Sequence, residues 1–332
     1  MNQLGGDTQS PILKVDNLHK WFPVHGGIFR REVARVKAVS GVSFELHQGE
    51  TLGIVGESGC GKSTLGRTVL QLYRPDLGKV IFEGRELSGL SDRDLRDVRR
   101  DLQVVFQDPY ESLNSRMTVR QILMEPFIIH RLYSRIERQK RVSELLDLVG
   151  LPENALDKYP HEFSGGQRQR IGIARAVALK PKVIVCDEPV SALDVSIQAQ
   201  VINLLIELQR EMNLALVFIA HDLAVVRHVS DRVAVMYLGK IVELTDAESI
   251  YLKPKHPYTK SLISAIPEIG SVSKDKVLPK GEVPSPIFPP NGCAYHPRCP
   301  KAREICKRQV PEIIDLNDKE GSRHFVSCHF PD

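Results

Sequence analysis

A glycine-rich segment near residue 60 has the residue types and spacing of a phosphate-binding loop. It matches the pattern G-x-x-x-x-G-K-[ST] at every fixed position, with the residues Gly56, Glu57, Ser58, Gly59, Cys60, Gly61, Lys62 and Ser63, followed by Thr64. The glycines let successive backbone N–H groups face phosphate oxygens, and a helix that begins near Lys62 adds its positive N-terminus. Lys62 is expected to reach the β- and γ-phosphates, and the Ser63 hydroxyl to bind Mg²⁺. The segment therefore predicts a site for ATP and Mg²⁺, to which Cys60 contributes only its backbone.

A pair of acidic residues supplies the second half of such a site. Asp187 and Glu188 come directly after an apolar run at 182–186, which predicts a buried strand. Asp187 is placed to hold Mg²⁺, generally through water, and Glu188 is placed to polarise the attacking water as a general base. The alternative is a strand end with two solvated acids. The phosphate-binding loop earlier in the chain favours the magnesium site.

Four further segments occur in a fixed order and resemble the motifs of the ABC ATPases. Phe163-Ser164-Gly165-Gly166-Gln167 is similar to the family's signature segment, and Gln107 to its Q-loop glutamine. Ser191-Ala192-Leu193-Asp194 is similar to its D-loop, and His221 to its switch histidine. This resemblance covers residues 12–245. It implies that Gln107 reaches Mg²⁺ and the lytic water, that Asp194 lies near nucleotide, and that His221 contacts the γ-phosphate.

The signature segment has a physical role of its own, because Ser164, Gly165, Gly166 and Gln167 open a predicted helix at 167–179. A helix N-terminus is a second anion-binding site, whereas one phosphate loop already serves this chain's own ATP. The resemblance implies that the second site binds the γ-phosphate of ATP held by a partner cassette. Two ATP molecules would then lie between two cassettes arranged head to tail.

An aromatic platform for adenine is expected near the end of the first strand. The resemblance places an aromatic residue there, and both Trp21 and Phe22 occupy the region. Counting from Asn17 favours Phe22. Either residue could instead be an apolar residue with a structural role.

The elements that position these residues alternate between strands and helices. β-Rich segments are predicted at 12–15, 36–42 and 43–46, a strand at 50–55, and a helix at 62–72. Short strands and a charged helix follow at 78–106, then helices within 117–150, a helix at 195–212 and a buried strand at 214–219. This order predicts an α/β fold, a mainly parallel sheet flanked by helices. The resemblance specifies a P-loop NTPase of ABC type: a RecA-like core, an antiparallel β subdomain and a helical subdomain inserted at about 108–165.

Composition limits where the protein acts and what it binds. A net charge of +4 on 332 residues gives no support for a nucleic-acid partner. No apolar run approaches the length of about 20 residues that crosses a bilayer, and the polar start does not resemble a secretory signal. We therefore expect a cytoplasmic protein that reaches a membrane only by docking onto other chains. Prolines become frequent after residue 250, which predicts an ATPase domain at 11–250 and a loop-rich extension at 251–332.

The extension indicates a subfamily. His256-Pro257-Tyr258-Thr259-Lys260 and Gly281-Glu282-Val283-Pro284-Ser285-Pro286 resemble the C-terminal extension of dipeptide and oligopeptide importer ATPases, in particular their second ATPase subunit. The resemblance implies a sister cassette as heterodimer partner, two transmembrane permease subunits, an indirect solute-binding protein, and a position on the cytoplasmic face of the membrane. Import of nickel or another small compound stays open, as do a soluble ATPase linked to nucleic acid and a non-catalytic regulatory cassette.

Four of the six cysteines lie within the last 40 residues: Cys293, Cys299, Cys306 and Cys328. In a reducing compartment such a group suggests a metal site more than disulfides. The spacing lacks the C-x₂₋₄-C pairs of structural zinc, and four thiolates on irregular loops can hold a [4Fe–4S] cluster. The resemblance favours the cluster, because some peptide-importer ATPases carry one. Zinc and free structural thiols are the alternatives.

Overall fold

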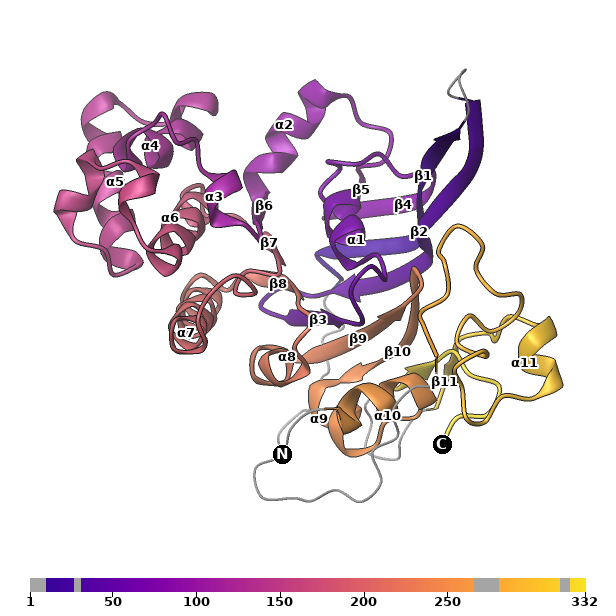
Figure 1. The fold of residues 1–332 in the computed structure, drawn as a ribbon. Coiled ribbons are helices and arrows are strands. Elements are labelled where there is room, and N and C mark those ends of the chain that lie inside the picture. The colour runs from indigo at the N-terminus through magenta and orange to yellow at the C-terminus, as the bar shows by residue number, and fades with distance from the viewer. Residues whose placement is uncertain (1–9, 27–30, 266–280, 317–322) are drawn as a thin grey trace, which may run out of the picture.

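Two β-sheets and a separate group of helices make up the protein. The computed structural model describes residues 10–26, 31–265, 281–316 and 323–332. Figure 1 shows the helices α3 to α6 set to one side of the strands, while the C-terminal segment lies against the opposite side. The α/β fold expected from the alternation of strands and helices is confirmed by this arrangement and by its likeness to solved ATPases, described below.

The smaller sheet is antiparallel, with the strand order β2-β1-β4-β5. Its strands are β1 (Leu13–Gly26), β2 (Arg31–Leu46), β4 (Leu77–Phe82) and β5 (Arg85–Glu86). The predicted segments at 12–15, 36–42 and 43–46 are therefore parts of two much longer strands. Register shifts along the β1–β2 pair interrupt the alternation of buried and exposed residues, so that only fragments of each strand show the expected pattern.

The larger sheet has the order β11-β12-β10-β9-β3-β8-β7-β6 and a parallel centre. The parallel strands are β3 (Thr51–Val55), β6 (Leu102–Val105), β7 (Val183–Asp187), β8 (Ala215–Ile219) and β9 (Arg232–Tyr237). Every residue of β3, β7 and β8 is buried, as expected for strands covered on both faces. Neither β9 nor β10 (Lys240–Asp246) was predicted from the sequence, although both contain several β-branched residues.

Some of the helices cover the larger sheet, and the others form the separate group to one side of the strands, called the side group. Those near the sheet are α1 (Lys62–Val69), α2 (Asp92–Asp101), α7 (Val195–Met212), α8 (Leu223–Val229), α9 (Ala247–Leu252) and α10 (Pro257–Ser264). The side group holds α3 (Pro109–Ser112), α4 (Val119–Ile129), α5 (Arg135–Leu148), the short 3₁₀ turns η1 (Glu153–Asp157) and η2 (Pro160–Glu162), and α6 (Gly165–Val177). Capping boxes at Thr118, Ser134 and Ser164 satisfy the first free N–H groups of α4, α5 and α6, and so fix where these helices begin.

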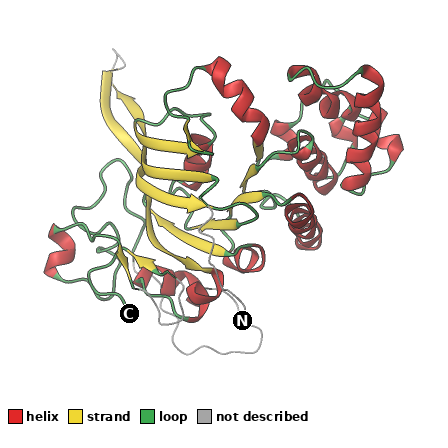
Figure 2. Cartoon of the chain, turned by 180° about the vertical axis from the view of Figure 1, so that it is seen from behind, coloured by secondary structure: helices red, strands yellow, loops and turns green. Residues whose placement is uncertain are grey.

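The C-terminal extension is built into the main body of the protein. Its strand β12 (Phe325–Val326) pairs with β10 and with β11 (Ile314–Asp315), so the extension completes one edge of the larger sheet. Tyr258 and Tyr295 belong to the main hydrophobic core, and α11 (Glu304–Arg308) is the last helix. Figure 2 shows this mainly irregular segment, in green, beside the strands. Among the helices that the structure describes, none combines the length and the apolar character needed to cross a bilayer.

Candidate ATP site

The phosphate-binding loop connects β3 to α1, as the sequence predicted. Two of its glycines are required by close approach of other strands. Gly61 has a φ of +104°, and a Cβ there would lie 2.0 Å from the carbonyl oxygen of Ala38 on β2. A Cβ on Gly56 would lie 2.1 Å from the carbonyl oxygen of Met236 on β9. The loop is therefore held between strands of both sheets, and any side chain at these positions would force it out of shape.

Lys62 is buried within this loop, with 4% of its surface exposed. Its Nζ donates hydrogen bonds to the carbonyl oxygens of Gly56 at 2.8 Å and Glu57 at 3.2 Å. Both acceptors belong to the loop itself, so the ammonium group stays at the centre of the turn. The first turn of α1 begins at the same residue, which adds the positive end of the helix to the ammonium charge.

A pocket of about 360 Å³ opens beside the loop, a volume suited to a small-molecule ligand. Its lining includes Phe22, Gln107 and Glu188, as well as most of the loop. Trp21 does not belong to this lining in the described part of the chain, so only Phe22 of the two aromatic candidates lies at the pocket. The other lining residues, which no sequence motif indicated, come from three separate segments: Val36, Lys37, Ala38, Leu238, Gly239 and Pro286.

Asp187 fits the role of a magnesium ligand. It ends β7, it is 2% exposed, and neither carboxylate oxygen has a hydrogen-bond partner among the described residues. The nearest cation is the Arg67 side chain, with its Nε 3.5 Å from Oδ2. A buried carboxylate without donors is costly, and a magnesium ion or its bound water would satisfy it. The donor set of Asp187, the Ser63 hydroxyl and Gln107 consists of oxygens, which Mg²⁺ prefers.

The three predicted catalytic side chains meet at one carboxylate oxygen. The Nε2 of Gln107 donates to Oε2 of Glu188 at 3.0 Å, and the Nδ1 of His221 lies 3.5 Å from the same atom. Glu188 adopts a left-handed conformation with a φ of +48°, uncommon for a residue with a side chain, and its backbone N–H donates to Ile219 on β8. This conformation turns the chain sharply at the end of β7 and directs the carboxylate toward the nucleotide pocket that it lines.

The signature segment lies apart from this pocket. Ser164 and Gln167 are exposed at the start of α6, and none of the residues 164–167 lines the pocket within the described chain. A Cβ on Gly166 would lie 2.3 Å from Cγ2 of Ile197 on α7, so the glycine permits close packing of these two helices. Asp194 is also exposed, at the N-cap of α7. Residues 164–167 and Asp194 therefore lie outside the pocket beside the phosphate-binding loop.

The four C-terminal cysteines come together around a single small cavity of about 10 Å³. All four are free thiols, and burial raises the pKa of Cys293 to about 11 and also raises the pKa values of Cys299 and Cys328. In the described residues, no group of three or more His, Cys, Asp or Glu side chains is arranged to hold a metal ion. The predicted proximity of the thiols is thus present, whereas the predicted [4Fe–4S] cluster is not shown by the described residues.

Comparison with known proteins places this site in a family. The ABC transporter family model matches residues 39–191, and the model described as oligopeptide/dipeptide transporter, C-terminal region, matches residues 242–306. The oligopeptide transport ATP-binding protein AppF of Bacillus subtilis (strain 168) is 57% identical, over 97% of this chain and 98% of AppF. This chain belongs to the ABC transporter family of ATP-binding proteins. OppF of Escherichia coli (strain K12), also an oligopeptide transport ATP-binding protein, is 52% identical over 96% of this chain and 95% of OppF.

Solved structures agree with this family assignment. The dimeric ATP-binding cassette MJ0796, in a post-hydrolysis state bound to ADP and phosphate, is 30% identical, with a TM-score of 0.63. The match covers 71% of this chain and 98% of MJ0796. A second cassette, cbiO1 from Clostridium perfringens, matches with a TM-score of 0.62 and 28% identity, over 74% of this chain and 92% of cbiO1. The ABC-type P-loop fold and the ATPase activity predicted from the sequence are therefore confirmed.

Proposed function

We propose that this ATPase drives the import of di- and oligopeptides, as a peripheral subunit on the cytoplasmic face of the cell membrane. The observation that carries the proposal is the match of the chain, along nearly its whole length, to oligopeptide transport ATP-binding proteins, including their C-terminal region. Residues 11–250 form the ATPase domain, and residues 251–332 form the extension typical of these importers.

Uptake by the assembled transporter tests the proposal. The chain, its sister cassette and its permease subunits would be reconstituted into liposomes with the solute-binding protein. We expect ATP-dependent uptake of labelled di- and oligopeptides. Uptake of nickel or a sugar without uptake of peptides would reject the peptide assignment. Stimulation of hydrolysis by DNA or RNA would favour the nucleic-acid alternative, and an assembled transporter that works without hydrolysis by this chain would favour a regulatory cassette.

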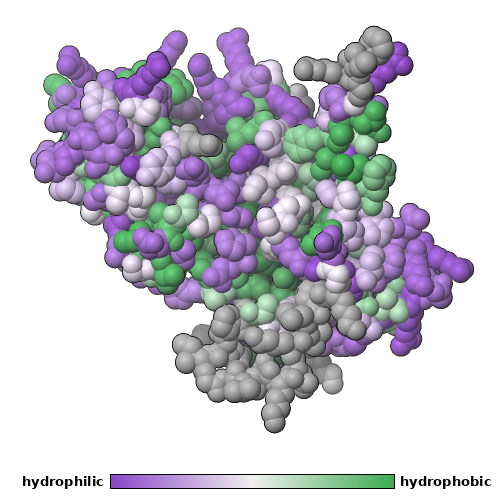
Figure 3. Space-filling model, viewed as in Figure 1, coloured by the Kyte–Doolittle hydropathy of each residue, from purple (hydrophilic) through white to green (hydrophobic). Residues whose placement is uncertain are grey.

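A groove between the core and the helical group is proposed as the docking site for the permease. It has a volume of about 690 Å³ and is lined by Tyr73 from the core and by Glu125 and Ile129 from α4. Figure 3 shows hydrophilic side chains over much of the outer helices, so the helical group is suited to an aqueous setting next to a membrane. Gln107 lines both this groove and the nucleotide pocket. The same side chain can therefore connect the state of the nucleotide with movement of the permease.

We infer that two cassettes close around two ATP molecules, with a sister cassette as the partner of this chain. The exposed N-terminus of α6 supports this inference, because it offers Ser164–Gln167 to a phosphate outside the chain's own pocket. The related MJ0796 cassette is dimeric. Within this chain's own site, Lys62 binds the β- and γ-phosphates, Glu188 accepts a proton from water, Gln107 orients Glu188, and His221 approaches the γ-phosphate. Mg²⁺, when bound by Ser63, Gln107 and Asp187, would neutralise charge on the phosphates.

Phe22 is proposed as the adenine platform. Its ring contacts Tyr73 edge to face at 5.3 Å between centroids, which holds it at the mouth of the pocket. Replacing Phe22 with Ala is expected to weaken MgATP binding by about 5- to 150-fold, since stacking of a base on an aromatic ring contributes about 1–3 kcal/mol. Titration with a fluorescent ATP analogue measures the change. Trp21→Ala is the matched control, and a larger loss of affinity for that variant than for Phe22→Ala would contradict the assignment.

A [4Fe–4S] cluster held by Cys293, Cys299, Cys306 and Cys328 is proposed as a structural centre of the extension. The lining of one cavity by all four thiols supports it, although the cavity would have to widen to admit a cluster. Anaerobically purified protein is expected to contain about four iron atoms per chain and to absorb near 400 nm, the stoichiometry and region of such a cluster. Cys299→Ser is expected to abolish both signals, and Cys186→Ala, a change at a buried thiol of β7, is expected to preserve them. Iron-free protein with bound zinc, or with no metal, would contradict the cluster.

A further inference from the structure

The C-terminal extension holds the phosphate-binding loop by direct contacts at Glu57. The guanidinium group of Arg298 donates two hydrogen bonds to the Glu57 carboxylate, at 2.7 and 3.0 Å. The backbone N–H of Glu57 donates to the hydroxyl of Tyr258, at 2.9 Å. Arg298 lies between Cys293 and Cys299 in the sequence, 241 residues after Glu57. Side chains of the C-terminal extension, which lies outside the nucleotide motifs, therefore form hydrogen bonds with the loop that binds ATP.

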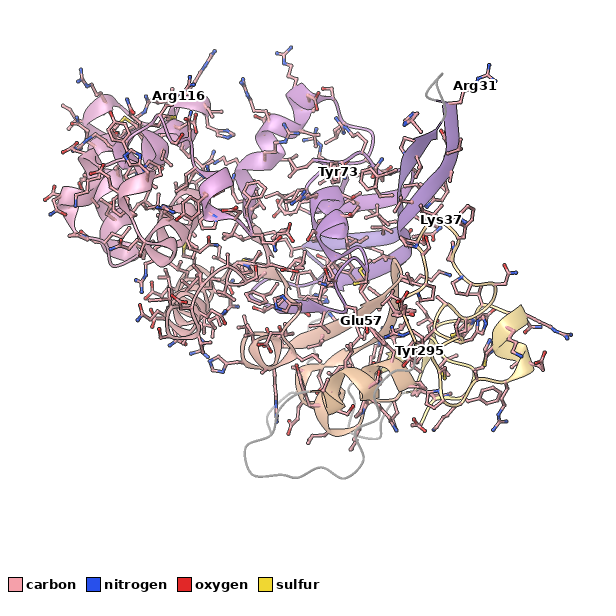
Figure 4. The ribbon with its side chains drawn as sticks, viewed as in Figure 1. Arg31, Lys37, Glu57, Tyr73, Arg116 and Tyr295 are labelled. Carbon is pink, nitrogen blue, oxygen red and sulfur yellow. The ribbon has the colours of Figure 1, made fainter. Side chains whose placement is uncertain are left out.

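The surroundings of Arg298 make this contact rigid. Its side chain is only 6% exposed, and that of Glu57 is 24% exposed. Tyr237, Tyr258 and Tyr295 contact one another, with ring centroids 4.7–5.3 Å apart, and Arg298 lies over the Tyr237 ring. Figure 4 shows Glu57 and Tyr295 next to each other where the loop meets the C-terminal segment. A bidentate pair with both partners largely out of water holds each side chain in one orientation.

Glu57 is held at its backbone N–H, its carbonyl oxygen and its side chain. Tyr258 accepts a hydrogen bond from its N–H, Lys62 donates one to its carbonyl oxygen, and Arg298 binds its carboxylate. The same lysine is the expected ligand of the β- and γ-phosphates. Displacement of Glu57 would therefore also displace the ammonium group that binds ATP.

The charge of Glu57 gives the contact a second effect. A carboxylate inside a phosphate-binding loop repels the polyphosphate of ATP unless a cation neutralises it. Arg298 supplies that cation, and the hydrogen bonds to Glu57 raise the pKa of Arg298, so that the guanidinium stays charged at any physiological pH. Without Arg298, the loop would lose an anchor and would also carry an uncompensated negative charge.

We propose that Arg298 and Tyr258 are positioning residues for the phosphate-binding loop, through which the C-terminal extension sets the affinity of this ATPase for MgATP. The two residues act through Glu57 and touch no reacting atom. Their loss is expected to raise the KM for ATP and to leave kcat at saturating ATP nearly unchanged. A purely structural role in the extension would leave both constants unchanged in the folded protein.

The first test uses the charge of Glu57. In the purified full-length chain, Arg298→Gln is expected to weaken binding of a fluorescent MgATP analogue about tenfold, within the range of about 5- to 150-fold that is typical of coupling between sites. The double variant Glu57→Gln/Arg298→Gln is expected to recover only the part of this loss that comes from the uncompensated charge. Arg308→Gln, an exposed arginine of α11 that pairs only with Glu304 among the described residues, is the matched control. Affinity that stays unchanged in Arg298→Gln, or that falls equally in Arg308→Gln, would overturn the proposal.

The second test avoids a change in charge, and it tests the proposal even if Arg298→Gln does not fold. Tyr258→Phe removes only the hydroxyl that accepts the N–H of Glu57, and it is expected to weaken MgATP binding about two- to tenfold, the contribution of one hydrogen bond. Tyr295→Phe is the control from the same aromatic group, since its hydroxyl contacts Ser261 and not the loop. Equal affinities for Tyr258→Phe and Tyr295→Phe would overturn the proposal. Hydrogen exchange at residues 56–63 is expected to quicken only in Tyr258→Phe.

Discussion

Replacing Glu188 with Gln is expected to lower kcat for ATP hydrolysis by about 10²- to 10⁴-fold, the usual contribution of a general base. The amide cannot accept the proton of the attacking water, although it has nearly the shape of the carboxylate and can still accept the hydrogen bond from Gln107. ATP binding should therefore persist, and ATP-bound pairs of cassettes should accumulate. Phosphate release measures turnover, and size-exclusion chromatography with MgATP measures pairing.

Controls separate loss of the base from a general disturbance. Glu207→Gln removes an exposed carboxylate on α7 and is expected to leave turnover unchanged. Thermal unfolding should show that the Glu188→Gln variant is folded, which matters because Glu188 adopts a left-handed backbone conformation. Unchanged hydrolysis in folded Glu188→Gln would disprove the general-base role.

Replacing Lys62 with Met is expected to weaken MgATP binding by at least about 30-fold, because removing one partner of a buried charge pair costs about 2–5 kcal/mol. Methionine keeps most of the apolar stem in place and removes only the ammonium group. Because that group also binds the carbonyl oxygens of Gly56 and Glu57, the empty loop should become more mobile in the variant. Equilibrium titration with a fluorescent ATP analogue measures the affinity.

A surface lysine provides the comparison. Lys79 is exposed on β4, where it forms an ion pair with Glu86, and Lys79→Met is expected to bind MgATP as the unchanged chain does. Tight ATP binding by the Lys62→Met variant would mean that the backbone N–H groups and the helix N-terminus alone hold the phosphates. The assignment of Lys62 as a ligand of the phosphates would then be wrong.

Several features could be predicted from the sequence because they depend on contiguous residues. The loop at 56–63 needs glycines at fixed positions and a following helix, and both requirements appear in the local sequence. Helix α7 begins at Val195 and ends at Met212, as its periodicity indicated. The acids at the end of β7 could be identified because an apolar run precedes them. In each case the pattern and the structure it predicts lie within the same short segment.

Only the tertiary structure decided which distant residues meet. A register shift between Lys20 and Trp21 interrupts the alternation of β1, so residue counting alone could not decide which aromatic ring faces the pocket. Gln107, Glu188 and His221 meet because the order β3-β8-β7-β6 brings the ends of separate strands to one edge. Arg298 reaches Glu57 because the C-terminal extension joins the main body through the pairing of β12 with β10 and through Tyr295, which belongs to the main core. A contact between residues far apart in the sequence depends on sheet order and packing, and no local pattern encodes these. The loop at 56–63 is thus determined by its own sequence, whereas its contacts with Tyr258 and Arg298 are determined by the whole fold.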